Sequence, residues 1–112
     1  MFKHISAINR IDGMSIEEFR HYWINVHSQI VRGRLPKLRK YLANFPVLDE
    51  GVIWPGSAQR LKCDALIELH FDSLEDILGA MQGPEWDSDE QRVSSVKCIA
   101  LLCNHKLIWE IS

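Results

Sequence analysis

The segment Leu61–Phe71 alternates apolar and polar side chains, and this pattern restricts the fold more than any other feature of the sequence. Its odd-numbered positions are all apolar: Leu61, Cys63, Ala65, Ile67, Leu69 and Phe71. Its even-numbered positions are mostly polar: Lys62, Asp64, Leu66, Glu68 and His70. Because successive side chains of a strand point to opposite faces, the segment is predicted to be a strand with one buried face.

Three further segments have the composition of strands: Phe2–Arg10, Lys37–Phe45 and Lys97–Ile111. A helix is expected from Ser15, which fits a capping box with Glu18, to the breakers Gly33 and Pro36. Its apolar face should consist of residues at spacings of three and four, namely Phe19, Trp23, Val26 and Ile30. A second helix is expected from the cap Asp72-Ser73 through Met81, followed by a helical turn over Glu85–Val93.

The expected order of elements is strand, helix, strand, strand, helix, strand. This order is typical of a ferredoxin-like α+β fold, βαββαβ, with an antiparallel four-stranded sheet. The length of 112 residues fits a single domain covering 1–112. Helices on one face leave the other face of the sheet open, and we expect Tyr41 on that open face. A second copy packed sheet to sheet would cover it, so we predict a homodimer that forms an α/β barrel.

Composition and charge argue against several classes of protein. The net charge is −2, so we expect no nucleic-acid partner, although five cations lie between Arg32 and Lys40. No apolar run approaches the ~20 residues of a membrane-spanning helix, so we expect no membrane partner. The first residues lack the pattern of a signal peptide, which predicts a cytoplasmic protein. The three cysteines have no zinc-type spacing, and no metal site is expected.

Three blocks of the sequence resemble the EthD family. They are Gly13–His27 (GMSIEEFRHYWINVH), Pro36–Tyr41 (PKLRKY) and Asp64–Ser73 (DALIELHFDS), with a weaker match at Gly83–Trp86. The resemblance covers most of the chain except the loop at 46–60, and it implies a dimeric α/β barrel. Relatives include a methylmuconolactone methylisomerase and fungal polyketide dehydratases or decarboxylases. Sister families include cofactor-free quinol-forming monooxygenases and haem-degrading enzymes.

His27 is the first candidate for catalysis. The resemblance implies that His27 and Tyr41 correspond to polar pocket residues of the lactone isomerase. An imidazole with an ordinary pKa of about 6.5 can take or give a proton near neutral pH. The alternative is a histidine whose ring is satisfied by a backbone carbonyl. Tyr41 can donate a hydrogen bond to a substrate oxygen, or it can be a core aromatic with its hydroxyl at the rim.

The polar face of the strand Leu61–Phe71 offers two more catalytic candidates, Asp64 and His70. Glu68 lies on the same face. If that face lines a cavity, Asp64 or Glu68 can orient a histidine or act as a base; if it is solvated, these residues are surface charges. Arg39 can pair with a carboxylate of the substrate or with an acid of a partner subunit. The full set of expected substrate-binding residues is Tyr22, Trp23, Arg39, Trp54 and Trp86.

These residues, together with what the resemblance to the EthD family implies, predict a small-molecule enzyme that needs no cofactor. We expect an acid–base isomerase, or a lyase of the dehydratase type, acting on a small cyclic catabolite such as a lactone or an aromatic polyketide-like ring. One alternative is an oxygen-dependent monooxygenase, either cofactor-free or linked to haem. Another is a non-catalytic dimer that binds a hydrophobic ligand. The expected partners are the small-molecule substrate and a second copy of the chain.

Overall fold

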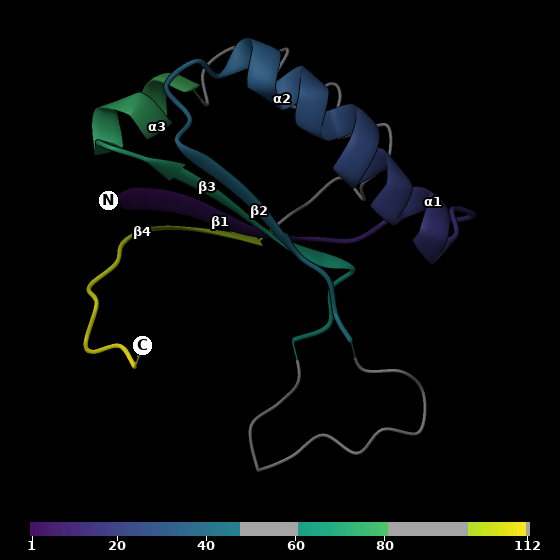
Figure 1. Ribbon diagram of the computed structural model, residues 1–112. Coiled ribbons are helices and arrows are strands. Elements are labelled where there is room, and N and C mark those ends of the chain that lie inside the picture. The colour runs from purple at the N-terminus through teal and green to yellow at the C-terminus, as the bar shows by residue number, and fades with distance from the viewer. Residues whose placement is uncertain (48–60, 81–98, 112) are drawn as a thin grey trace.

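The computed structural model describes residues 1–47, 61–80 and 99–111. Within these ranges, the strands are β1 (Phe2–Ile8), β2 (Lys40–Asn44), β3 (Ala65–Phe71) and β4 (Ile99–Asn104). The helical segments are α1 (Ile16–His21), η1 (Tyr22–His27), α2 (Ser28–Arg34) and α3 (Leu74–Ala80). The strands form one antiparallel sheet in the order β2-β3-β1-β4, and the helices cover one of its faces (Figure 1). The predicted α+β fold of the ferredoxin-like type is confirmed.

The long helical stretch from Ile16 to Arg34 begins where the sequence predicts. Ser15 Oγ accepts a hydrogen bond from the backbone N–H of Glu18 at 3.1 Å, which satisfies one donor of the first turn. Just before it, Gly13 has a φ of +88°, a conformation that glycine adopts without steric cost. The turn and the N-cap therefore fix the direction in which the helix leaves β1.

The buried face of this helix differs from the prediction. The buried residues recur at every fourth position: Phe19, Trp23, His27, Val31 and Leu35. In an ideal α-helix of 3.6 residues per turn, a repeat of four would drift around the axis. The middle segment, η1, is π-helical and holds more residues per turn, which keeps the row facing the sheet. Val26, which was expected on the buried face, is consequently exposed. His27 is buried in its place.

The register of the sheet places Tyr41 on the face covered by the helices. Tyr41 lies opposite Leu69, a buried core residue, whereas its neighbour Leu42 lies opposite Glu68. Directly paired residues of neighbouring strands share a face, so Tyr41 and Glu68 point to opposite sides. The expectation that Tyr41 lies on the open face is wrong. Its ring instead packs against the hydrophobic core.

All four strands are shorter than predicted, because each needs a neighbouring strand to pair with. Phe2, the first residue of β1, is paired with Asn104, the last residue of β4. Residues 105–111 therefore run past the end of β1 and have no regular structure. In the same way, β3 begins at Ala65, which pairs with Ile8 at the end of β1. The chain beyond β4 turns away on the side opposite the helices (Figure 1).

The hydrophobic core lies between the helices and the sheet. Its largest fully buried side chains are Trp23, Phe19, Phe71, Ile8 and Ile77. Among the described segments, no helix combines the length and hydrophobicity needed to cross a bilayer. Most of the loop expected at Pro46–Gln59, with Trp54, and the helical turn expected at Glu85–Val93, with Trp86, lie outside the described residues.

Candidate functional site

A hydrogen bond between His27 and Tyr41 joins the helical layer to the sheet. His27 Nδ1 lies 2.9 Å from the hydroxyl oxygen of Tyr41. His27 ends the π-helical segment η1, and Tyr41 belongs to the edge strand β2, so the contact links two separate elements. His27 is only 8% exposed, whereas Tyr41 is half-buried. The sequence therefore places an acid–base group and a hydroxyl donor in direct contact at a sheltered position.

Two further aromatic residues surround His27. The ring centroid of Trp23 lies 3.8 Å from that of His27, and Tyr22 lies at 6.2 Å. Trp23 is 2% exposed, and within the described residues its indole Nε1 has no hydrogen-bond partner. An unpaired buried donor typically costs about 1–3 kcal/mol of stability. The planes of the two rings are tilted by 53°, so the indole packs closely against the imidazole without stacking flat on it.

A groove of about 610 Å³ runs from Tyr41 along the edge of the sheet. One wall is formed by α2 and the other by the start of β2 and the segment before it. Its lining residues are Ser28, Gln29, Val31, Arg32, Leu35, Pro36, Leu38, Arg39, Lys40 and Tyr41. Small-molecule sites commonly have volumes of about 300–1,000 Å³, so the groove is large enough for a ligand with one to three rings.

Asp64 lies at another place in the fold. Its carboxylate accepts hydrogen bonds from the backbone N–H of Arg10 at 2.7 Å and from the guanidinium of Arg10 at 3.0 Å. These contacts tie the start of β3 to the chain that leaves β1. Within the described residues, no contact joins Asp64 to His27 or Tyr41. Its observed role is to hold two segments together beside the turn at Gly13.

The comparison with known families settles what kind of protein this is. A model of the EthD domain matches residues 11–93, which is most of the chain. The chain belongs to the EthD family. This confirms the resemblance seen in the block Gly13–His27 and the segments that follow it. No curated protein matches the sequence of this EthD protein.

Solved structures share the fold of this EthD protein. At3g17210 from Arabidopsis thaliana has a TM-score of 0.70 at 15% identity, covering 98% of this chain and 100% of its own. A dimeric protein of ferredoxin-like fold from Bacteroides fragilis has a TM-score of 0.58 at 15% identity, with coverage of 93% and 95%. A variant of MhuD with two manganese protoporphyrin IX molecules bound per active site has a TM-score of 0.56 at 15% identity, with coverage of 100% and 99%.

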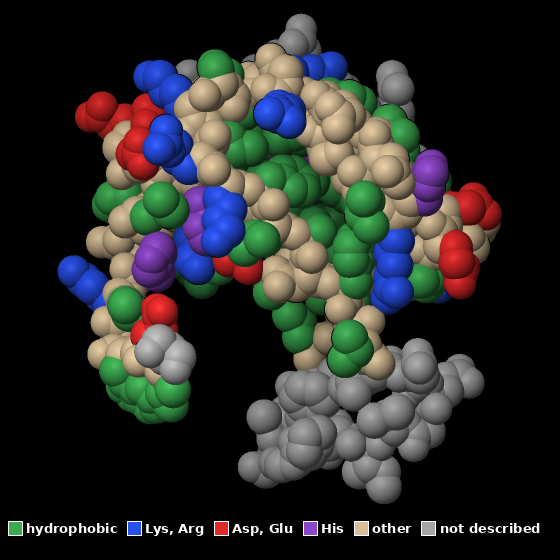
Figure 2. All heavy atoms as spheres, in the orientation of Figure 1, with side chains coloured by type: hydrophobic (Ala, Val, Ile, Leu, Met, Phe, Trp, Pro, Cys, Tyr) green, Lys and Arg blue, Asp and Glu red, His purple; other side chains and the backbone are tan. Residues whose placement is uncertain are grey.

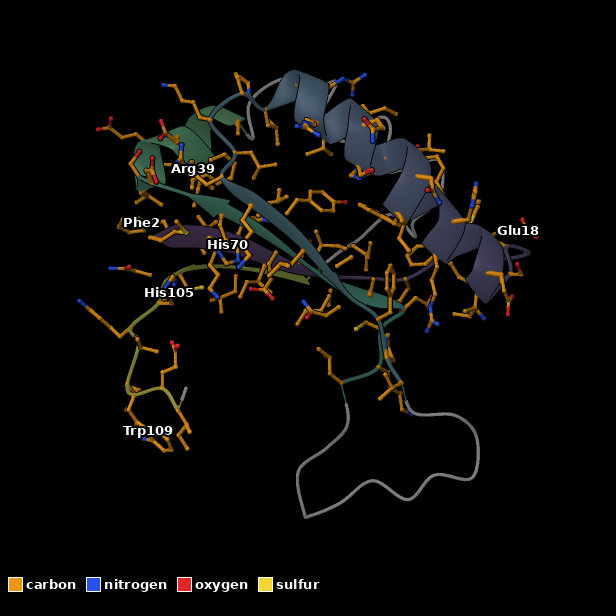
Figure 3. The ribbon with its side chains drawn as sticks, in the orientation of Figure 1. Phe2, Glu18, Arg39, His70, His105 and Trp109 are labelled. Atoms are coloured by element: carbon orange, nitrogen blue, oxygen red, sulfur yellow. The ribbon has the colours of Figure 1, made fainter. Side chains whose placement is uncertain are left out.

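His70 lies on the opposite face of the sheet from His27. Its Nε2 is 3.1 Å from the carboxylate of Glu68, which also accepts hydrogen bonds from Lys3 at 3.2 Å and Asn44 at 2.9 Å. Figure 3 shows His70 and His105 on the side of the sheet away from the helices. The structure thus separates His70 from the pair formed by His27 and Tyr41.

Glu68 is the centre of this polar cluster. Burial alone would raise the pKa of its carboxyl, but hydrogen bonds from Asn44, Lys3 and His70 and the charge of Lys3 lower the pKa below its ordinary 4.5. The ionised cluster therefore stabilises the fold above about pH 4.5, and this contribution is lost as the pH falls through the lowered pKa.

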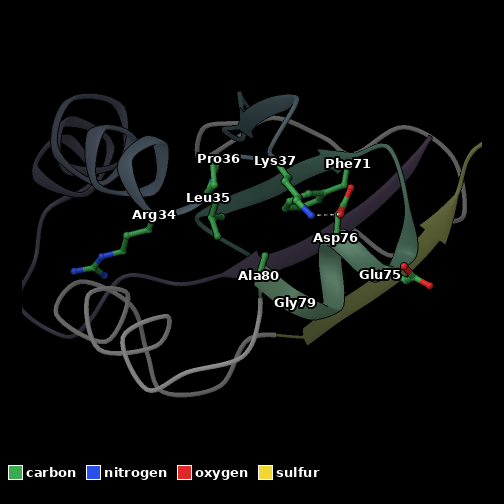
Figure 4. A pocket seen from close by; sticks show the side chains of 9 residues that line it. All are labelled: Arg34, Leu35, Pro36, Lys37, Phe71, Glu75, Asp76, Gly79 and Ala80. Atoms are coloured by element: carbon green, nitrogen blue, oxygen red, sulfur yellow. Dashed lines mark ion pairs between the residues drawn. The ribbon is translucent and has the colours of Figure 1, made fainter.

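A second cavity, of about 260 Å³, lies between the end of α2 and α3 (Figure 4). An ion pair between Lys37 and Asp76, 3.4 Å long, crosses it. Its charged lining residues comprise two cations, Arg34 and Lys37, and two acids, Glu75 and Asp76. Among the described residues, no group of His, Cys, Asp and Glu has the arrangement of a metal site.

Proposed function

We propose that this EthD protein is an acid–base enzyme that acts on a small cyclic compound without a cofactor. The reaction is an isomerisation or an elimination, and the substrate is a lactone or an aromatic polyketide-like ring. The observation that carries the proposal is the 2.9 Å contact between His27 and Tyr41, because Tyr41 also lines a groove of ligand size. Family membership supports the same class of protein.

In this mechanism, Nε2 of His27 removes a proton from a carbon next to the substrate carbonyl, while its Nδ1–H donates a hydrogen bond to the hydroxyl oxygen of Tyr41. The imidazole becomes imidazolium, and the electron pair of the C–H bond moves into an enolate. The hydroxyl of Tyr41 donates a hydrogen bond to the enolate oxygen, where negative charge develops. Imidazolium then returns the proton to a different carbon in an isomerisation, or to a departing hydroxide, released as water, in an elimination. No net charge or electron is transferred to the protein.

Proton exchange into an unsaturated five-membered lactone tests this proposal. In D₂O, α-angelica lactone should exchange its ring C–H for deuterium faster with the protein than in buffer, as followed by proton NMR. Tyr41→Phe removes only the hydroxyl, so we expect exchange to slow by about tenfold to a hundredfold while the thermal unfolding midpoint stays nearly constant. An unchanged exchange rate in Tyr41→Phe would remove Tyr41 from the mechanism.

The alternatives predict different results from the same preparation. A non-catalytic binding protein would hold a lactone without accelerating exchange. Oxygen chemistry would consume oxygen with an added hydroquinone, or would require haem. The related fold of MhuD holds manganese protoporphyrin, so haemin is the probe. A Soret band that disappears in His27→Gln would replace the acid–base proposal by a haem-linked one.

We also propose that the functional unit is a homodimer whose sheets face each other. On the open face, Leu101 of β4 is 59% exposed, and the tail beyond β4 exposes Leu107, Ile108, Trp109 and Ile111. Figure 3 shows Trp109 far from the sheet and the helices. Large apolar side chains exposed on the open face and on the tail beyond it favour burial against a partner chain. The structural relative from Bacteroides fragilis is described as dimeric.

Sedimentation equilibrium tests the dimer. The wild-type chain should sediment as a dimer at micromolar concentration, and Leu101→Glu should raise the dissociation constant by about tenfold or more because it places a charge in the apolar interface. Ile24→Glu, on the exposed side of the helical layer, is the matched control and should leave the dimer intact. A monomeric wild-type protein, or equal effects of the two variants, would contradict the proposal.

A further inference from the structure

The described lining of the groove beside Tyr41 carries only positive charge. It includes three cations, Arg32, Arg39 and Lys40, and none of its described residues is acidic. Between the cations lie the apolar side chains Val31, Leu35, Pro36 and Leu38. Figure 2 shows a hollow with hydrophobic side chains between the helices and the front strand, and cationic side chains around it. An apolar floor with a cationic rim fits a ligand that has a ring and an acid group.

Three cations outside the groove form ion pairs: Lys3, Arg10 and Lys37. Lys3 pairs with Glu68 at 3.2 Å, and Arg10 pairs with Asp64 at 3.0 Å. The second cavity likewise contains equal numbers of cations and acids. The described lining of the groove, by contrast, holds three cations and no acid.

Arg32 and Arg39 are the two guanidinium groups available at the groove. Arg32 is exposed on α2 and forms no ion pair or side-chain hydrogen bond within the described part of the chain. Arg39 is 3.8 Å from Asp72, but both side chains are more than 60% exposed, at 63% and 66%. An exposed pair at that distance contributes little, so a ligand carboxylate can replace Asp72 at small cost.

We propose that the groove binds the carboxylate of a small aromatic or cyclic acid. Arg32 and Arg39 hold the carboxylate, since a guanidinium offers paired donors that match its two oxygens. The ring lies over Val31 and Leu35, with its far end toward Tyr41. This inference rests on the proposed function, because it names the substrate class for the site of His27 and Tyr41.

Binding of a matched pair of probes tests the inference. 2-Naphthoate and 2-naphthamide have the same shape, but only the first is an anion. Titration followed by isothermal calorimetry should give a dissociation constant about tenfold lower for 2-naphthoate at low ionic strength, and the difference should shrink in 0.5 M salt. Arg32→Gln should weaken 2-naphthoate by about tenfold and leave 2-naphthamide unchanged. Arg34→Gln, two residues along the same helix but outside the groove lining, is the control.

Three results would overturn the inference: equal affinity for the two probes, no binding of either, or an equal effect of Arg32→Gln and Arg34→Gln. A change of oligomeric state in Arg32→Gln would also overturn it, because the cation would then serve an acid of a partner subunit. The result of the binding test can be distinguished from the result of the proton-exchange test. Selective binding of 2-naphthoate in His27→Gln, with no proton exchange in the wild type, would support the groove and reject the acid–base mechanism.

Discussion

Replacing His27 by Gln is expected to slow deuterium exchange into α-angelica lactone by about 10²–10⁴-fold, the usual contribution of a general acid–base group. The amide of Gln can hydrogen-bond to the hydroxyl of Tyr41 across a similar distance, so the polar contact between helix and sheet can be kept. The amide cannot accept a proton near neutral pH. The variant therefore removes the chemistry while preserving most of the local structure.

The matched control is His21→Gln, on the same helical stretch. His21 is exposed and contacts only Asn25 among the described side chains, at 3.2 Å. Its replacement should leave the exchange rate within about twofold of the wild type, because substitution of an exposed side chain usually changes stability very little. The control therefore shows whether the loss of any histidine from this helix slows exchange. Equal rates in His27→Gln and the wild type, measured by proton NMR at pH 7, would assign catalysis to another group.

The sequence predicts the sheet well because its signals are local. The alternation in Leu61–Phe71 gave the buried face of β3, and the cap at Ser15 gave the start of the helix. The predicted strands are too long, because a strand ends where the neighbouring strand that pairs with it ends. Asn104 is the last residue of β4 only because it faces Phe2, about a hundred residues away.

The contact between His27 and Tyr41 required information that no local pattern contains. The helix was expected to bury Val26, since the prediction assumed 3.6 residues per turn throughout. The π-helical segment shifts that phase and turns His27 inward. The face of Tyr41 depends on its register against Leu69. The resemblance to EthD proteins implied that both residues belong to a pocket. Periodicity alone was equally compatible with a purely structural role for His27 and for Tyr41.

The groove illustrates a second limit of sequence reasoning. The cluster of cations from Arg32 to Lys40 is visible in the sequence, but only the fold shows which of them meet an acid. Lys37 is paired with Asp76 of α3, whereas Arg32 has no described acidic partner. Asp64 and His70, both expected at the catalytic site, are instead held by Arg10 and Glu68.

Trp23→Ala is expected to destabilise the protein by about 3–5 kcal/mol, the usual cost of deleting a large buried aromatic side chain. Trp23 is 2% exposed, and its ring contacts Phe19 as well as His27, with centroids 6.1 Å and 3.8 Å away. For a domain of this size, the thermal unfolding midpoint should fall by roughly 10–20 °C. Circular dichroism during heating measures the change.

Trp23→Phe separates packing from the polar atom of the indole. Phenylalanine keeps an aromatic ring beside His27 but lacks the Nε1 donor, for which the described part of the chain offers no partner. The loss in stability should therefore be only about 1 kcal/mol, since the volume change is small and no hydrogen bond is broken. A loss in Trp23→Phe as large as in Trp23→Ala would show that the indole N–H, rather than the ring, stabilises the fold. A small loss would show that the packing of the ring, and not its N–H, stabilises the fold.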